Sequence, residues 1–266
     1  MYLIIFFLEA KNLFHKINLK KITFLIMNIF IYLIFIKKEK KANKIIYNLI
    51  FNNKTIDYIL KMRKVVYTVN LGKYDKLKDF NKQKGWDYFA FIDSNFTQIK
   101  ETNWTLIYVE EDLKILNLSK IKYTRYLKLH PHLFFKNYSL SIYIDATYSI
   151  KGDLNEFCLR LLSPKKIIYS LEHYNRNSVF SEINVVTLAK KDKNSTTSLV
   201  RIKYQKEKFP DNNGLVDNSL IIRKHNEKKN IFLMEEWWKE IKNYSHRDQL
   251  SFNYAMWKTR IKNKYI

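Results

Sequence analysis

Polar side chains stand at the ends of several apolar runs of the sequence. Asp93 closes the run WDYFAFID, and Asp145 follows LSIYI. In an open, mostly parallel sheet, ligands bind beyond the carboxyl ends of the strands, where these side chains would meet. Asp and Asn also favour turns, so each residue taken alone has a purely structural reading. The run KVVYTVN and the turn after it add four more candidates for ligand binding, in this case of a nucleotide-bearing ligand: Thr68, Asn70, Tyr74 and Asp75.

The segment Asp145-Ala-Thr147 indicates a possible metal site. An apolar strand that ends in Asp-x-Asp can hold a divalent metal against a sugar diphosphate, because Mg²⁺ and Mn²⁺ prefer hard oxygen ligands. Thr147 stands where the second acid would be. One carboxylate and one hydroxyl could still hold Mn²⁺ or Mg²⁺ through water, so we expect these two residues as ligands while metal dependence stays open.

Two pairs of basic residues could contact phosphate. Arg125 and Lys128 are three residues apart in IKYTRYLKLH, so on a helix they share one face and could clasp a diphosphate. A solvated basic face is the alternative. His173 and Arg176 follow the strand KKIIYS on a loop, where they suit phosphate or sugar hydroxyls.

The segment SHRDQLSFNYAMWK, from Ser245 to Lys258, places charges at the start of a predicted helix. Ser245 and Asp248 fit a capping box, in which the acid reaches back to the backbone. That interpretation leaves Arg247 and Gln249 unexplained, and we expect them to contact the acceptor or a phosphate. Asp248 is then a candidate catalytic residue that takes a proton from an acceptor hydroxyl. Asp145 is the second candidate catalytic residue.

The elements that carry these residues alternate from residue 64 onward. Strands are predicted at 64–70, 86–93, 104–110, 138–146, 165–170 and 218–224. Helices are predicted around 118–134 with a break at Pro131, from Asp153, which is expected to be an N-cap, and around 178–208, 227–243 and 246–261. Residues 189–198 could instead form an exposed loop. This alternation predicts an α/β fold, a mostly parallel twisted sheet with helices on both faces.

Composition narrows the class of protein. The chain has 266 residues, 47% of them hydrophobic, so it can bury a core. The net charge of +23 would attract polyanions, but lysine far outnumbers arginine, which favours a solvated surface and makes nucleic acid an unexpected partner. The single cysteine, Cys158, can form no internal disulfide and is expected on an apolar helix face.

Residues 1–61 differ from the rest and are expected to form an N-terminal extension before a domain at 62–266. The apolar run at 22–36 would reach about 22 Å as a helix, short of the roughly 30 Å hydrocarbon core. Two interpretations stay open: a membrane anchor or membrane-surface helix, and a leader with Met62 as the working start. We therefore expect a cytoplasmic protein that associates with a membrane through residues 22–36 if that segment is retained.

Seven segments, taken in order, resemble one known family. They are VVYTVNLGKYDKL, WDYFAFID, RYLKLHPHLFF, YSLSIYIDATYSIKGDL, GLVDNSLIIRKHN, WWKEI and SHRDQLSFNYAMWK. Together they are similar to the glycosyltransferase family, domain of unknown function 616, that includes the plant mucilage-related hexosyltransferases. The resemblance spans about residues 64–258, and the chain departs from it beside Gly72, where relatives tend to have a second glycine.

The resemblance implies a GT-A-like fold and transfer of a hexose from a nucleotide-sugar donor to a glycan or another hydroxylated or lipid-linked acceptor, as in polysaccharide biosynthesis. It also implies that Arg125 and Lys128 lie by the donor phosphates and that Asp145 stands at the metal-binding strand end. Two alternatives stay open at this point. One is a non-catalytic relative that binds sugar or membrane, and the other is a basic protein that binds nucleic acid.

Overall fold

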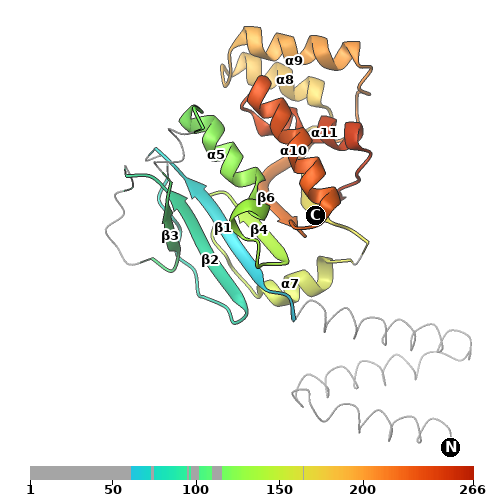
Figure 1. The fold of residues 1–266 in the computed structure, drawn as a ribbon. Helices are drawn as coiled ribbons and strands as arrows, with labels where there is room; N and C mark the ends of the chain where they lie inside the picture. Colours follow the sequence, from blue (N-terminus) through green and yellow to red (C-terminus); the bar gives the residue numbers. More distant parts are fainter. Residues whose placement is uncertain (1–60, 73–74, 95, 97–101, 110–115, 164) are drawn as a thin grey trace, which may run out of the picture. The chain divides into compact units, whose positions relative to one another are not determined.

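The computed structural model describes residues 61–72, 75–94, 96, 102–109, 116–163 and 165–266 (Figure 1). The N-terminal extension expected at 1–61, apart from its last residue, lies outside this part, as does Tyr74. Within the described residues, no helix is both long and apolar enough to cross a membrane.

The described part is built on one seven-stranded sheet. Its strands lie side by side in the order β3-β2-β1-β4-β6-β5-β7. Their bounds are β1 Lys64–Asn70, β2 Trp86–Ile92, β3 Thr105–Tyr108, β4 Leu140–Ile144, β5 Ile168–Glu172, β6 Val216–Arg223 and β7 Lys264–Tyr265.

Every strand except β6 runs in the same direction. β1 pairs in parallel with both β2 and β4, while β6 pairs antiparallel with β4 and with β5. The carboxyl ends of β1, β2 and β4 therefore meet at one edge, and the start of β6 reaches the same edge. The mostly parallel α/β sheet predicted from the sequence is confirmed.

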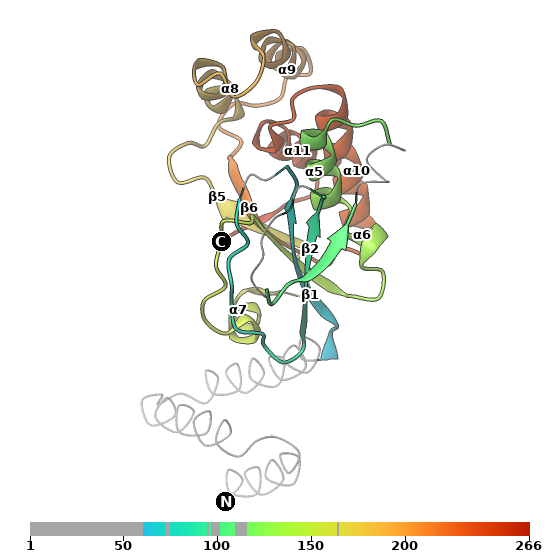
Figure 2. The ribbon, with the colours of Figure 1, turned by 90° about the vertical axis from the view of Figure 1, so that its left-hand side faces the viewer.

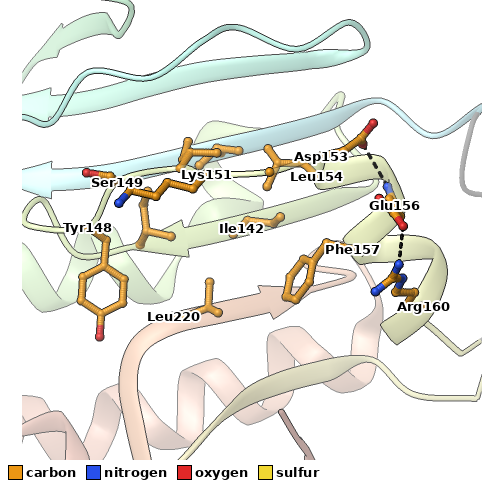
Figure 3. Close-up of a pocket in the computed structure, with 14 residues that line it drawn as sticks. Ile142, Tyr148, Ser149, Lys151, Asp153, Leu154, Glu156, Phe157, Arg160 and Leu220 are labelled. Carbon is orange, nitrogen blue, oxygen red and sulfur yellow. Dashed lines mark hydrogen bonds and ion pairs between the residues drawn. The ribbon is translucent and has the colours of Figure 1, made fainter.

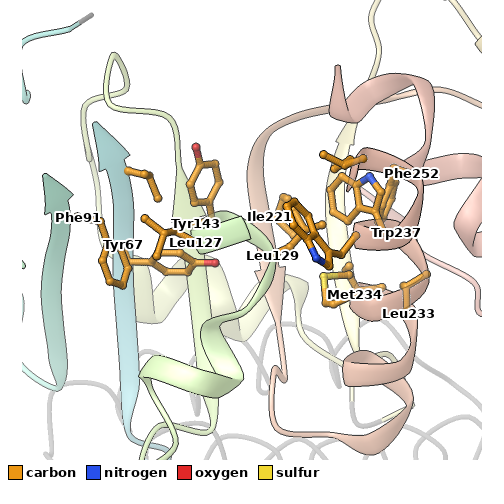
Figure 4. Packing of buried hydrophobic residues seen from close by; sticks show 14 of the residues in the cluster. Tyr67, Phe91, Leu127, Leu129, Tyr143, Ile221, Leu233, Met234, Trp237 and Phe252 are labelled. Carbon is orange, nitrogen blue, oxygen red and sulfur yellow. The ribbon is translucent and has the colours of Figure 1, made fainter. Parts of the chain in front are cut away.

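Helices lie on both faces of the sheet. One face packs against α5 Lys120–Leu129, α10 Lys228–Asn243 and α11 Phe252–Thr259. Figure 4 shows Tyr67 and Tyr143 of the strands together with Leu127 of α5, and Ile221 of β6 beside Trp237 of α10. The opposite face packs against α7 Leu154–Leu161, whose Cys158 is fully buried. Short α6, Pro131–Phe134, follows α5 after the break expected at Pro131.

The long helix predicted around 178–208 is two helices. α8 Val179–Leu188 and α9 Asn194–Lys206 are separated by Ala189–Lys193, where Lys190 has a positive φ of 51°. A left-handed residue ends a helix, since an L side chain rarely continues one from there. The exposed loop considered for 189–198 is thus confined to its first five residues. Figure 2 shows α8 and α9 at the opposite end of this unit from α7.

The segment from Ser245 to Lys258 is also not one helix, and the predicted capping box is wrong. A 3-10 helix, η1 Asp248–Leu250, precedes α11. The Ser245 hydroxyl accepts from the backbone N–H of Arg247 and donates to Asp192 at 2.6 Å. The Asp248 carboxylate turns to α5 instead of back to the backbone of Ser245, because a buried acid gains more from a cation than from a neutral amide.

The N-cap predicted at Asp153 is confirmed. Its Oδ1 accepts from the backbone N–H groups of Asn155 and Glu156 at 2.7 and 3.0 Å. These are two of the donors that the first turn of α7 leaves without a partner in the helix.

Candidate functional site

The buried Lys128 contacts two acids at the carboxyl edge of the sheet. Asp145 follows the end of β4, and Asp248 begins η1. Lys128 Nζ lies 2.7 Å from Asp248 Oδ2 and 3.8 Å from Asp145 Oδ1. Arg125 Nε lies 3.8 Å from the same oxygen of Asp248. We call Arg125, Lys128, Tyr143, Asp145 and Asp248 the Lys128 cluster. Its members come from α5, β4 and η1, segments that are distant in the sequence.

The backbone of β4 fixes the position of Asp145. Its N–H donates to Ser219 O of β6 at 2.9 Å, which continues the strand pairing by one residue. Tyr143 lies two residues earlier and so on the same face of the sheet. Its hydroxyl donates to Asp145 Oδ1 at 2.7 Å, while 42% of the Asp145 side chain stays exposed. Asp145 is therefore an anchored carboxylate that solvent or a ligand can reach.

Asp248 is held differently. Burial alone would raise the pKa of its carboxyl, but Arg125 and Lys128 outweigh burial and hold the pKa well below its usual range. Trp237, fully buried in α10, donates its indole N–H to the backbone oxygen of Asp248 at 3.2 Å. A general base works best with a pKa near the working pH. This geometry suits Asp248 to charge pairing rather than to proton abstraction.

Arg125 and Lys128 share one face of α5, as the spacing predicts. Lys128 is 2% exposed, and its ammonium lies 4.5 Å from the centre of the Tyr143 ring. Arg125 is 19% exposed and also donates from Nε to the backbone oxygen of His246 at 3.3 Å. The Arg125 side chain is thus partly exposed, whereas Lys128 is enclosed.

Asp93 does not join the other two acids. Its Oδ2 accepts from Lys120 Nζ at 2.7 Å and from the backbone N–H of Gly72 at 3.1 Å. Lys120 and Lys128 are eight residues apart, about 12 Å along α5 at 1.5 Å per residue. Asp93 therefore binds the first turn of α5, whereas Lys128 lies in the last turn of the same helix. Asp93 and Asp145 were expected to meet at the strand ends, but Asp145 shares Lys128 with Asp248, whereas Asp93 contacts Lys120.

The first-strand candidates differ in their contacts. Asn70 donates from Nδ2 to the backbone oxygen of Asp75 at 2.7 Å, which closes the turn after β1. The Asp75 side chain is exposed. Thr68 is fully buried, and its hydroxyl has no hydrogen-bond partner among the described residues. Donor contact by these residues stays a prediction.

His173 and Arg176 contact each other after β5. Arg176 Nη2 lies 2.9 Å from His173 Nε2, and Arg176 Nε donates to Glu182 at 2.7 Å. The backbone N–H groups of Asn175 and Arg176 both donate to His173 Nδ1. These bonds fold the loop on itself and tie it to Glu182 of α8.

Arg247, Gln249 and Thr147 flank the Lys128 cluster. Arg247 and Gln249 are half-buried, and the charge of Arg247 adds to the lowering of the Asp248 pKa. Thr147 is exposed, two residues beyond Asp145. Contact of these residues with an acceptor, a phosphate or a metal stays a prediction.

The sequence interpretation missed several residues beside Asp145. Tyr143 is one, although its spacing of two along a strand could have revealed it. The Tyr148 hydroxyl lies 2.7 Å from the Ser219 hydroxyl, and the Ser219 N–H donates to Asp217 Oδ1 at 2.9 Å. Asp217 and Ser219 stand at the start of β6, which only the antiparallel pairing with β4 brings to this edge.

The donor set fits a divalent metal poorly. Mg²⁺ and Mn²⁺ bind about six oxygen ligands. Within the described ranges, no group of three or more His, Cys, Asp or Glu is arranged to hold a metal ion. Asp145 already accepts from Tyr143, and the space between Asp145 and Asp248 holds the ammonium of Lys128.

A separate cavity lies on the other face of the sheet. It has a volume of about 340 Å³ and is lined by Ile142, Leu220 and Phe157, with Tyr148 and Lys151 at its side (Figure 3). Ile142 and Leu220 belong to the core that packs on α7, whereas Tyr143 belongs to the core that packs on α5. This mainly apolar space does not suit a diphosphate, and it is not part of the Lys128 cluster.

Fold and site together define an α/β protein with a charged, partly exposed edge at the carboxyl ends of its parallel strands. The chain belongs to the TOD1/MUCI70, glycosyltransferase-like domain family, which it matches over residues 24–266. The family resemblance seen in the sequence is confirmed, and the match begins inside the expected N-terminal extension. Sugars are the general class of substrate that this membership implies.

Solved glycosyltransferase structures are similar to this chain at low identity. WbbM, a bifunctional glycosyltransferase, is 10% identical with a TM-score of 0.47, over 77% of this chain and 39% of its own. Mouse xyloside xylosyltransferase 1 is 9% identical with a TM-score of 0.42, over 77% and 84%. The mannosyltransferase Ktr4p of S. cerevisiae is 10% identical with a TM-score of 0.38, over 79% and 74%. Among curated proteins no match was found.

Proposed function

We propose that this domain transfers a hexose from a nucleotide-sugar donor to a hydroxyl group of a glycan or lipid-linked acceptor. The observation that carries the proposal is the Lys128 cluster. It places two cations and a partly exposed carboxylate at the edge where a mostly parallel sheet binds ligands. Membership of a glycosyltransferase-like family supports the same reaction class.

The chemistry requires charge compensation. Transfer breaks the bond between the anomeric carbon and the diphosphate oxygen, forms a bond from that carbon to the acceptor oxygen, and releases the acceptor proton to water. The departing nucleoside diphosphate gains negative charge, which preorganised cations stabilise. Arg125 and Arg247 are both partly exposed and both act on the charge of Asp248, and we assign them to the diphosphate.

Asp145 is the carboxylate that we assign to the reacting sugars. Its anchored but exposed side chain can accept a hydrogen bond from a sugar hydroxyl or face the anomeric centre. Asp248 instead balances Arg125 and Lys128, so its contribution to transfer is to hold the cations in place. The roles of the two acids thus follow from their different exposure.

A panel of UDP- and GDP-sugars tested by thermal shift would examine this proposal without knowledge of the acceptor. A ligand that binds the folded state raises the melting temperature. We expect one nucleotide class to stabilise the domain and its sugar to be hydrolysed slowly or transferred. Stabilisation without turnover at any acceptor would indicate the non-catalytic alternative, and no stabilisation by any nucleotide sugar would contradict the proposal.

We further propose that the protein is cytoplasmic and binds a membrane surface through residues 22–36. The support is the apolar run and its flanking lysines alone, since this segment lies outside the described residues. Flotation of the full chain with anionic vesicles, compared with a chain that starts at Met62, would test it. Equal flotation of the two chains would contradict it.

A further inference from the structure

An ammonium occupies the place between two carboxylates at the proposed donor site. Lys128 Nζ lies 2.7 Å from Asp248 and 3.8 Å from Asp145, and the face of the Tyr143 ring lies 4.5 Å away. The side chain is 2% exposed. Lys128 is therefore enclosed by groups that favour a positive charge, and this enclosure restricts where its ammonium can lie.

The position matters because a metal shared by these acids would need the same space. A divalent cation at Asp145 and Asp248 would displace the ammonium and would also face Arg125, which lies 3.8 Å from the same Asp248 oxygen. Like charges at such distances repel strongly in a buried setting. Of these two acids, only Asp145 would remain as a ligand, and one of its oxygens is already bonded to Tyr143.

The local charge is already positive without a metal. Arg125, Lys128 and Arg247 contribute three positive charges and Asp145 and Asp248 two negative ones, which leaves +1 (3 − 2). Without Lys128 the balance would be zero, and a diphosphate would meet a site with no net attraction. The ammonium of Lys128 therefore supplies positive charge to this site. In a site rich in acidic residues, a bound divalent metal supplies it.

We infer that Lys128 takes the place of a divalent metal in this site, so that the donor diphosphate binds without one. The inference rests on the proposed function, and it names the group that compensates the leaving diphosphate. Lys128 compensates the negative charge of Asp145 and Asp248. Arg125 and Arg247 are then left to contact the phosphates. This differs from the Mn²⁺ or Mg²⁺ site expected from the sequence.

Calorimetric titration of UDP and GDP into the full chain tests the inference. The titrations are run with excess EDTA and again with Mn²⁺ or Mg²⁺. We expect one nucleotide to bind in EDTA with a dissociation constant within about threefold of its value with metal. Binding that requires metal, or that tightens more than about tenfold with it, would overturn the inference and leave the proposed function standing. No binding of either nucleotide under any condition would count against both.

Electron paramagnetic resonance of Mn²⁺ gives a second readout that does not depend on nucleotide. The wild-type chain should leave the signal of free Mn²⁺ unchanged. Lys128→Met combined with Arg125→Met should bind Mn²⁺, because it removes both cations beside Asp248 and leaves Asp145 and Asp248 facing each other. The same double variant with Asp248→Asn added is the matched control and should lose this binding. Stoichiometric Mn²⁺ binding by the wild type would overturn the inference whether or not the variants fold.

Discussion

The Tyr143 hydroxyl donates a hydrogen bond of 2.7 Å to Asp145 Oδ1, so a buried ring positions the one partly exposed carboxylate of the Lys128 cluster. The bond explains why Asp145 can be well placed and still reachable. It also means that a variant at position 145 should keep an oxygen that accepts from Tyr143, since a buried hydroxyl without a partner costs about 1–3 kcal/mol.

Asp145→Asn is expected to lower donor turnover by at least about a hundredfold, the size of effect seen when one group that stabilises a transition state is removed. The melting temperature should stay nearly unchanged, because the amide oxygen still accepts from Tyr143. Hydrolysis of the nucleotide sugar identified by thermal shift gives the rate. Asp79→Asn, at an exposed position outside the cluster, is the control. Full activity of Asp145→Asn would remove this residue from the proposed mechanism.

Removing one member of the buried ion pair should destabilise the domain strongly. Lys128→Met and Asp248→Asn are each expected to cost about 3–5 kcal/mol in the free energy of unfolding, because each leaves a buried charge without its partner. The double variant should cost less than the sum of the two. Urea unfolding measures all three, with the exposed Lys165→Met as control. Additive effects would show that the two groups do not interact.

Two buried histidines predict a loss of stability in mild acid. Burial lowers the pKa of His132 to about 4, an effect to which His130 adds, and burial lowers the pKa of His225 to about 4. The unfolded state therefore takes up protons below pH 6.5, while the folded state does so only near pH 4. Stability is fully present above pH 6.5 and falls toward pH 4, by about 1–3 kcal/mol for each histidine after allowance for partial exposure.

Urea unfolding between pH 7.5 and 4 would measure this dependence. The range runs from above the unfolded pKa of histidine, 6.5, down to the folded pKa of about 4. His225→Gln is the informative variant, because the amide can still donate to the Phe135 backbone oxygen that His225 contacts at 2.9 Å. It should flatten the dependence. A pH profile as steep as that of the wild type would contradict the assignment to His225. Asp248 affects the free energy of unfolding at lower pH than the histidines do. Its carboxylate contributes stability above about pH 4, and this contribution is lost as the pH falls further.

Cys158 should be unreactive in the folded protein. Burial raises the pKa of its thiol to about 12, although Lys64 partly opposes the shift. Only the thiolate attacks alkylating reagents. We expect no labelling by iodoacetamide at pH 8 in buffer and complete labelling in guanidinium chloride, as read by intact mass. Fast labelling of the native chain would show that α7 does not cover this residue as described.

Local features of the fold could be predicted because short-range physics decides them. Pro131 ends α5, and Asp153 caps α7, since each effect involves neighbours in the chain. The split between α8 and α9 was missed, because the left-handed Lys190 leaves little signal in a polar segment. The capping box predicted at Ser245 was wrong because of a contact distant in the sequence. Lys128 binds the Asp248 carboxylate that the capping box would have used.

The sequence by itself determined the mostly parallel α/β fold, the family, and the strand end at Asp145, because strand patterns and short motifs are written in adjacent residues. Only the tertiary structure decided which acids meet. Lys128 and Asp248 are 120 residues apart, and their contact depends on how α5 and α10 pack on one face of the sheet. The same packing sent Asp93 to Lys120 instead. Charge pairing acts through space, and so its partners follow from the packed fold and not from their spacing along the chain.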